Sequence, residues 1–207
     1  MCGIIGYTGH REVTPILIGA LKRMEYRGYD SAGVAVMNGQ LKIVKDAGKV
    51  SNLEQLVRGS SLAGTAGIGH TRWATHGVPN QVNAHPHSDE DQSIALVHNG
   101  IIENYSALRH ELGKSGHRFV TETDTETVAH LIEELYTGDF ALAVTNALRL
   151  VKGTYGFAIM NRNHPDMIIA ARMGSPMVIG HGSGENFVAS DPAAFLHFTR
   201  DVTYLED

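Results

Sequence analysis

Short hydrophobic runs with the two-residue period of a β-strand alternate along the chain with longer stretches that follow the 3.6-residue period of a helix. Strands are predicted over residues 3–7, 33–37, 41–45, 67–71, 94–98, 155–160, 167–171, 177–180 and 187–189, with a strand-like segment at 202–205. Asn38-Gly39, between the second and third strands, predicts a two-residue hairpin turn. Many short strands joined by turns favour antiparallel sheets.

Three stretches carry a hydrophobic face with helical spacing. Residues 15–24 form the first, and the second begins with a capping box, in which Thr123 caps the first turn and Glu126 reaches back to it. The apolar positions are Ile16, Ala20, Leu21 and Met24 in the first stretch, Val128, Leu131, Ile132 and Leu135 in the second, and Phe140, Val144, Leu148 and Val151 in the third. The pattern predicts stacked antiparallel sheets between layers of helices.

The length and composition of the chain are typical of one large globular domain. Of the 207 residues 43% are hydrophobic and 19% are charged, and the formal net charge is −5. No basic run indicates a nucleic-acid partner, and no apolar stretch has the length of a signal peptide or a membrane span. The single cysteine excludes an internal disulfide and is typical of a reducing cytosol, so a cytoplasmic protein is expected.

That single cysteine, Cys2, directly follows the start methionine. Removal of Met1 would leave a thiol and a free α-amine on one residue. An α-amine titrates at about 7.7–8.0 and a thiol at about 8.5, so the amine can accept the thiol proton near neutral pH. A nucleophile with an adjacent base is the arrangement used in covalent catalysis. The alternative is a buried structural cysteine that begins the first strand.

Two loop segments carry further candidate residues. Arg72 follows a predicted strand, and a guanidinium can bind a carboxylate through two parallel N–H bonds. Trp73, the single tryptophan, belongs either to the core or to a flap over a binding site. The earlier segment from Arg27 to Gly33 contains Tyr29 and is either a well-made turn or a loop of the site.

Asn99-Gly100 and Asp124 complete a candidate site for an amide substrate. Asn-Gly alone is a turn signal, but in an amidase the Asn99 side chain and the Gly100 N–H would form an oxyanion hole. Asp124 would favour the positive end of a helix or bind a ligand ammonium. Cys2, Arg72 and Asp124 together offer the nucleophile, the carboxylate partner and the ammonium partner that free glutamine requires.

The twelve histidines raise the question of a metal site. His85-Pro86-His87 has ligand-like spacing, with His76 and His98 elsewhere in the sequence. However, the chain has no second cysteine and no His-Glu-x-x-His segment, so we predict no metal and no other cofactor. His85 and His87 are expected to hydrogen-bond loop backbone near the site.

Taken together, these segments resemble the glutaminase domains of glutamine–fructose-6-phosphate aminotransferases. The resemblance extends over essentially the whole chain, from Cys2-Gly3-Ile4-Ile5-Gly6 to Ala189-Ser190-Asp191. Segments 27–31 and 71–77 are more similar to this family than to the phosphoribosyl-diphosphate amidotransferases. The resemblance implies an α+β fold of the N-terminal-nucleophile hydrolase type, a four-layer αββα sandwich of two stacked antiparallel sheets between helices.

The resemblance also implies roles for individual residues. Cys2 would be the nucleophile, with Asn99 and Gly100 as the oxyanion hole. The substrate-binding residues would be Arg72 for the carboxylate, Asp124 for the ammonium, and Trp73, Thr75, His76 and His85 around the pocket. Arg27 and Tyr29 would support the site from their loop.

The implied reaction is hydrolysis of the L-glutamine side-chain amide to L-glutamate through a Cys2 thioester. In a full-length enzyme the ammonia would convert fructose 6-phosphate to glucosamine 6-phosphate in a C-terminal sugar isomerase domain. Residues 1–207 are expected to form the glutaminase domain without that second domain, and the full-length enzyme is expected to be a homo-oligomer. Two alternatives stay open: another N-terminal-cysteine amide hydrolase, and a non-catalytic glutamine-binding domain that retains Met1.

Overall fold

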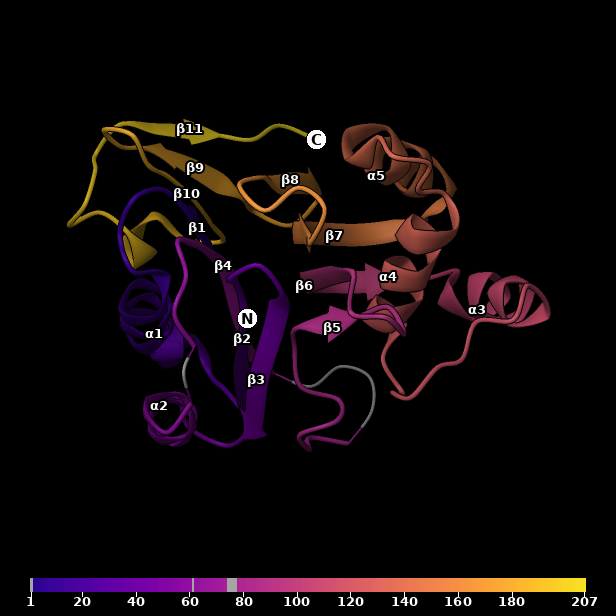
Figure 1. Cartoon of the computed structure of the whole chain (residues 1–207), viewed down its shortest axis with the longest axis horizontal. Coiled ribbons are helices and arrows are strands. Elements are labelled where there is room, and N and C mark those ends of the chain that lie inside the picture. Colours follow the sequence, from indigo (N-terminus) through magenta and orange to yellow (C-terminus); the bar gives the residue numbers. More distant parts are fainter. Residues whose placement is uncertain (1, 61, 74–77) are drawn as a thin grey trace.

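The computed structural model describes residues 2–60, 62–73 and 78–207, and these form two stacked antiparallel sheets (Figure 1). The larger sheet has seven strands in the order β11-β9-β10-β1-β4-β2-β3. Its strands are β1 (Gly3–Thr8), β2 (Ser31–Met37), β3 (Leu41–Ala47), β4 (Ala66–Arg72), β9 (Val178–His181), β10 (Asn186–Ala189) and β11 (Val202–Tyr204). The smaller sheet has the order β5-β6-β7-β8, with β5 (His87–Ser88), β6 (Ile94–Ile102), β7 (Gly153–Asn161) and β8 (Ile168–Met173).

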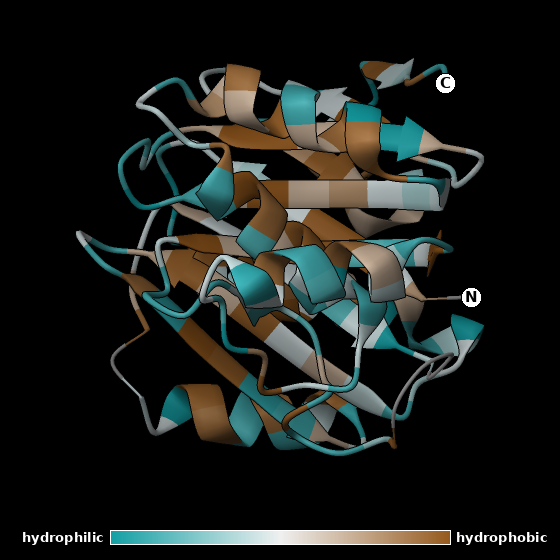
Figure 2. Cartoon of the chain, turned by 90° about the vertical axis from the view of Figure 1, so that its right-hand side faces the viewer, coloured by the Kyte–Doolittle hydropathy of each residue, from teal (hydrophilic) through white to brown (hydrophobic). Residues whose placement is uncertain are grey.

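Helices cover the outer face of each sheet, so that the layers run helix, sheet, sheet, helix. In Figure 1, α1 (Val13–Met24) and α2 (Val50–Arg58) lie on the left, and α3 (Tyr105–Lys114), α4 (Asp124–Glu134) and α5 (Phe140–Leu150) lie on the right. Figure 2 looks onto the right-hand helices and shows hydrophobic segments concentrated on the strands behind them. This αββα sandwich confirms the predicted fold class. Among the described residues, no helix combines the length and the apolar composition needed to span a bilayer.

The hydrophobic core is divided into three layers by the two-residue period of the strands. On β1, Ile5 and Tyr7 pack toward α1, whereas Ile4 faces the other sheet. On β6, Ile94 and Leu96 pack toward the helices α4 and α5, whereas Ala95 and Val97 face inward. Central strands such as β1 and β4 bury both faces, because they have a helix layer on one side and a sheet on the other.

Three local features differ from the sequence predictions. The hairpin between β2 and β3 pairs Met37 with Leu41, so its loop has the three residues 38–40. Asn99-Gly100 is no turn, because β6 continues through it to Ile102. The helices α2 and α3 were not predicted, and α3 buries only Leu112 among its residues, which leaves a weak hydrophobic pattern.

The predicted capping box at α4 is half right. The Thr123 side chain accepts a hydrogen bond from the Glu126 N–H, as predicted. The Glu126 carboxylate, however, accepts from the backbone N–H groups of Val120 and Thr121, at 2.8 and 2.9 Å. Glu126 does not reach back to the Thr123 N–H because that N–H already donates to the Thr121 hydroxyl at 3.2 Å.

Candidate active site

The candidate site lies between the two sheets, at one end of the sandwich. There the inward-facing side chains of β4 and β6 meet the residue that precedes β1. On β4 the buried Ala66 and Ile68 face the other sheet, and His70 and Arg72 continue that row with the two-residue period. On β6, Asn99 continues the inward row of Ala95 and Val97. The β1–β4 register pairs Gly3 with Thr71, which puts Cys2 beside these residues.

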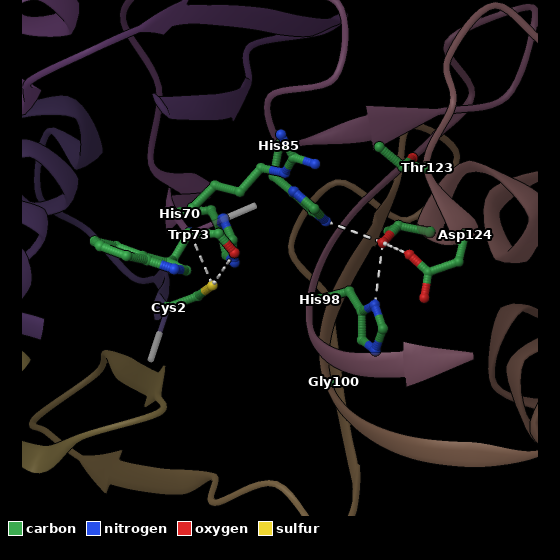
Figure 3. Close-up of a pocket in the computed structure, with 10 residues that line it drawn as sticks. Cys2, His70, Trp73, His85, His98, Gly100, Thr123 and Asp124 are labelled. Atoms are coloured by element: carbon green, nitrogen blue, oxygen red, sulfur yellow. Dashed lines mark hydrogen bonds between the residues drawn. The ribbon is translucent and has the colours of Figure 1, made fainter. Parts of the chain in front are cut away.

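Cys2 is held by the backbone of Trp73. The Trp73 N–H donates to Sγ at 3.1 Å, and Sγ lies 3.6 Å from the Trp73 carbonyl oxygen (Figure 3). Burial raises the pKa of the Cys2 thiol above its ordinary value, and the hydrogen bond from the Trp73 N–H opposes that shift. A thiol in this setting needs a nearby base to become a nucleophile at neutral pH.

Asn99 joins the two sheets next to Cys2. Its Nδ2 donates to the Cys2 carbonyl oxygen at 3.1 Å, and its Oδ1 lies 2.9 Å from His70 Nε2. A side-chain amide nitrogen carries two N–H groups, so one remains for another acceptor beside Cys2. Because Oδ1 only accepts, His70 Nε2 is the donor in this pair.

Gly100 follows Asn99 in a conformation that suits glycine alone. Its φ is 135°, and a Cβ built there would lie 2.0 Å from the Thr154 carbonyl oxygen. Because glycine has no Cβ, the Gly100 backbone can lie this close to its neighbours. Gly100 also lines the pocket.

Asp124 lies across the pocket from Cys2, at the first residue of α4 (Figure 3). Its Oδ2 accepts a hydrogen bond from the Ile102 N–H at 2.8 Å, which ties α4 to the end of β6. The Thr125 hydroxyl lies 3.0 Å from His85 Nε2, 3.0 Å from His98 Nδ1 and 3.4 Å from Asp124 Oδ1. One hydroxyl therefore links three polar side chains that line the pocket.

The predicted loop residues fall into two groups. Arg72 and Trp73 line the pocket. Arg72 is 3% exposed, whereas Trp73 is 58% exposed and is no core residue. A Cβ at Gly28 would lie 2.5 Å from the Trp73 ring, so the segment before β2 supports this indole. Arg27 itself contacts Asp191 at 3.3 Å, and neither Arg27 nor Tyr29 lines the pocket.

Burial keeps three histidines at or near the pocket, His70, His85 and His87, neutral. It lowers the pKa of His70 to about 3 and those of His85 and His87 well below the usual range. His85 lines the pocket as predicted, but its Nε2 contacts the Thr125 hydroxyl, and His87 Nε2 lies 3.2 Å from the Thr123 hydroxyl. The contact of His85 is to a threonine side chain and not to the loop backbone, whereas His87 has a hydrogen bond with the Asn83 backbone besides its threonine contact.

The sequence analysis assigned no site role to some of the residues that line the pocket. Two residues that it did assign to the site lie outside the described residues. Thr75 and His76 fall in the segment 74–77 that the structure does not describe. The residues that the prediction missed are His70, His98, Thr123 and Thr125. For His70 the signal was present, because positions 66, 68, 70 and 72 form one inward row. No sequence signal distinguishes Thr125 from the other threonines of the segment 121–127.

With this geometry in view, comparisons with known proteins are informative. Residues 70–197 match the model of the glutamine amidotransferase domain family. The whole chain is 54% identical over 214 residues to glutamine--fructose-6-phosphate aminotransferase [isomerizing] from Chlorobaculum tepidum, of which it spans 35%. A relative with the same name from Thermus thermophilus is 54% identical over 208 residues, and the chain spans 34% of it. The chain thus covers about a third of the length of these relatives.

Solved structures with lower sequence identity to this chain share its fold. Glutamine phosphoribosylpyrophosphate amidotransferase from B. subtilis superposes with a TM-score of 0.82 at 32% identity, over 99% of this chain and 44% of that one. A glutamine aminotransferase class-II domain protein from Silicibacter pomeroyi, 17% identical over 99% of this chain and 91% of that one, shares the fold with a TM-score of 0.63. The chain is more similar to the fructose-6-phosphate aminotransferases, at 54% identity, than to the phosphoribosylpyrophosphate amidotransferase, at 32%. This difference agrees with the resemblance predicted from the sequence. The chain belongs to the glutamine amidotransferase domain family.

Proposed function

We propose that the chain hydrolyses the side-chain amide of L-glutamine through a thioester on Cys2. The observation that carries this proposal is the 3.1 Å hydrogen bond from Asn99 Nδ2 to the Cys2 carbonyl oxygen. It holds an amide donor from β6 of one sheet beside the thiol at the start of β1 in the other sheet. A tetrahedral oxyanion that forms on Cys2 would therefore meet a donor that is already oriented.

The reaction runs in two stages. After removal of Met1, the Cys2 α-amine takes the thiol proton, and Sγ attacks the side-chain carbonyl carbon of glutamine. Asn99 Nδ2 and the Gly100 N–H stabilise the oxyanion. When the carbon–nitrogen bond breaks, the protonated α-amine returns the proton to the leaving ammonia. Water then attacks the γ-glutamyl thioester and releases glutamate and the Sγ thiolate, which is reprotonated.

Substrate recognition follows from the charges around the pocket. Arg72 binds the α-carboxylate of glutamine through its planar guanidinium, and Asp124 binds the α-ammonium group. Trp73 and His85 border the bound substrate, and Thr75 and His76 are assigned to substrate binding on the family resemblance alone. Arg27 and Tyr29 support this arrangement through their loop, since Gly28 contacts the Trp73 ring.

In a longer polypeptide of the kind named for the relatives, the ammonia would be used in a second domain. We infer that this domain is a sugar isomerase domain, which accepts fructose 6-phosphate and gives glucosamine 6-phosphate. The support is the name of the relatives and the third of their length that this chain spans. Residues 1–207 then serve as the ammonia-producing domain of a cytoplasmic homo-oligomer, with no cofactor, nucleic acid or membrane required.

The proposal is tested by glutamate release from L-glutamine together with the intact mass of the protein. The form without Met1 should turn over glutamine, and added hydroxylamine should divert the thioester to γ-glutamyl hydroxamate. Cys2→Ala should abolish both products. A form with one extra residue before Cys2 keeps the thiol but loses the free amine, so it should also be inactive.

Each step has a result that contradicts it. Turnover by Cys2→Ala would remove the thioester from the mechanism. Full activity of the form with the blocked amine would remove the α-amine as the base. Faster hydrolysis of asparagine or simple acyl amides than of glutamine would indicate a different amide hydrolase.

A further inference from the structure

A cluster of metal-ligating side chains lies on the outer helical layer, apart from the pocket. His130 and Glu133 stand one turn apart on α4, and His117 lies on the segment that follows α3. Their exposed side-chain fractions are 1% for His130, 11% for His117 and 28% for Glu133. Among the described residues, these three form a group whose ligand atoms all lie within 4.8 Å of one another.

The ligand atoms form a nearly equilateral triangle. His117 Nδ1 lies 3.1 Å from His130 Nδ1, and Glu133 Oε2 lies 3.3 Å from each of these nitrogens. Two ligands on a tetrahedral Zn²⁺, with bonds of about 2.0–2.1 Å, are separated by roughly 3.3 Å. The triangle therefore has the dimensions of one face of a tetrahedral zinc site.

The surroundings are those of a metal site rather than a chance contact. His117 Nε2 lies 3.0 Å from Glu134 Oε2, so the ring can donate its second N–H to a carboxylate, as metal-bound histidines usually do. The Phe119 ring packs edge-on against His130 at 4.7 Å between centroids and limits its movement. Burial lowers the pKa of His130, which favours the neutral imidazole that binds metals.

The local charge also favours a cation. Burial raises the pKa of the Glu133 carboxyl, and the carboxylates of Asp89, Asp91 and Glu90 raise it further. These carboxylates therefore act electrostatically on the cluster. A divalent ion would offset the repulsion among them.

We propose that His117 Nδ1, His130 Nδ1 and Glu133 Oε2 bind a Zn²⁺ ion, with water at the fourth position. Two imidazoles and one carboxylate suit Zn²⁺ better than Mg²⁺ or Ca²⁺, which prefer oxygen ligands. The ion would join the segment after α3 to α4, whose first residue, Asp124, lines the pocket. It would thus stabilise the helical layer, and it takes no part in the proposed amide hydrolysis.

The test uses direct binding, in a Cys2→Ala background that removes the thiolate as a competing ligand. After treatment with EDTA and removal of the chelator, the chain should bind one Zn²⁺ by calorimetry and show a higher melting temperature with Zn²⁺. Co²⁺ should give the intense visible absorption of a four-coordinate ion without a thiolate band. His117→Gln and Glu133→Gln should remove this binding, and Glu134→Gln should weaken it about 10- to 100-fold.

Two exposed residues of α3 supply matched controls. His110→Gln and Glu111→Gln make the same changes outside the cluster and should leave zinc affinity unchanged. Circular dichroism of each metal-free variant establishes that it is folded, and Glu134, 47% exposed, is a position where substitution is tolerated. Absence of stoichiometric binding, or equal binding by the parent chain, His117→Gln, Glu133→Gln and Glu134→Gln, would overturn the proposal. Loss of binding in the α3 controls would overturn it as well.

Discussion

His70 Nε2, on β4, lies 2.9 Å from Asn99 Oδ1, on β6, and this contact links the two sheets beside Cys2. Because Asn99 Oδ1 accepts from His70, its Nδ2 is directed to the Cys2 carbonyl. Burial lowers the pKa of His70 to about 3, so the ring stays neutral and keeps its proton on Nε2. We infer that His70 is a positioning residue for the amide of Asn99.

The first prediction is that His70→Leu lowers kcat for glutamine and changes KM little. Loss of one hydrogen bond costs about 1 kcal/mol, which corresponds to roughly 5-fold in kcat when the lost interaction only orients a transition-state donor. His70→Gln retains a donor and should restore part of the rate. Steady-state kinetics of glutamate release measure all three proteins.

A double-mutant cycle separates this role from a structural one. Asn99→Ala should lower kcat by about 10²–10³-fold, the loss typical of an oxyanion-hole donor. In that background His70→Leu should have little further effect, because the side chain that it orients is gone. If the two losses multiply instead, His70 acts independently of Asn99.

The second prediction compares two glycines. Gly100→Ala should destabilise the chain, because a Cβ at φ 135° would meet the Thr154 carbonyl oxygen at 2.0 Å. Strained backbone of this kind costs about 1–3 kcal/mol. Gly113→Ala, in α3, meets nothing within 4 Å and should stabilise the helix by up to about 1 kcal/mol. Urea unfolding checks both, and equal effects would contradict the strain at Gly100.

The third prediction concerns the Thr125 hydroxyl, which links His85, His98 and Asp124. Thr125→Val keeps the shape but leaves buried polar groups without this partner, at a cost of about 1–3 kcal/mol in the free energy of unfolding. If Asp124 binds the substrate ammonium, KM for glutamine should also rise.

Thr127 is the control for that change. Its side chain is fully buried, and within the described structure its hydroxyl has no hydrogen-bond partner. Thr127→Val should therefore be neutral or stabilising in the same unfolding experiment. A similar loss in both variants would show that the Thr125 hydrogen bonds contribute nothing specific.

The fourth prediction is a loss of stability in mild acid. The pKa of His70 is about 3 in the folded chain and about 6.5 when unfolded, so between these values the unfolded state binds more protons. The stabilising contribution is complete above pH 6.5 and is lost as pH falls toward 3. The loss in the free energy of unfolding between pH 6.5 and 5 should amount to about 2 kcal/mol.

The measurement is the free energy of unfolding in urea at pH 7 and at pH 5. His70→Gln removes the titrating ring, so its stability should depend less on pH in this range. Buried His85 and His87 have lowered pKa values of the same origin, so part of the dependence should persist. An unchanged pH profile for His70→Gln would show that His70 is not held neutral by burial.

Much of the fold was predictable, because hydrophobic spacing reports which faces are buried. The strands β1, β4, β7 and β10 and the helices α1, α4 and α5 have clear periods of two or 3.6 residues. The pattern fails at α3, whose side chains are mostly exposed, and at Asn99-Gly100, where turn chemistry competes with the pairing of β6 and β7. There the register of the sheet prevails over the local preference.

The sequence by itself determined which side chains share a face of each strand, and it determined that the thiol stands at position 2. These properties are local, since alternation along a strand does not depend on the rest of the chain. Only the tertiary structure decided that Cys2 meets Asn99, 97 positions away, and that Thr125 links His85 and His98. Such contacts depend on how the two sheets stack and on how α4 packs against the end of β6, and no spacing in the sequence encodes either.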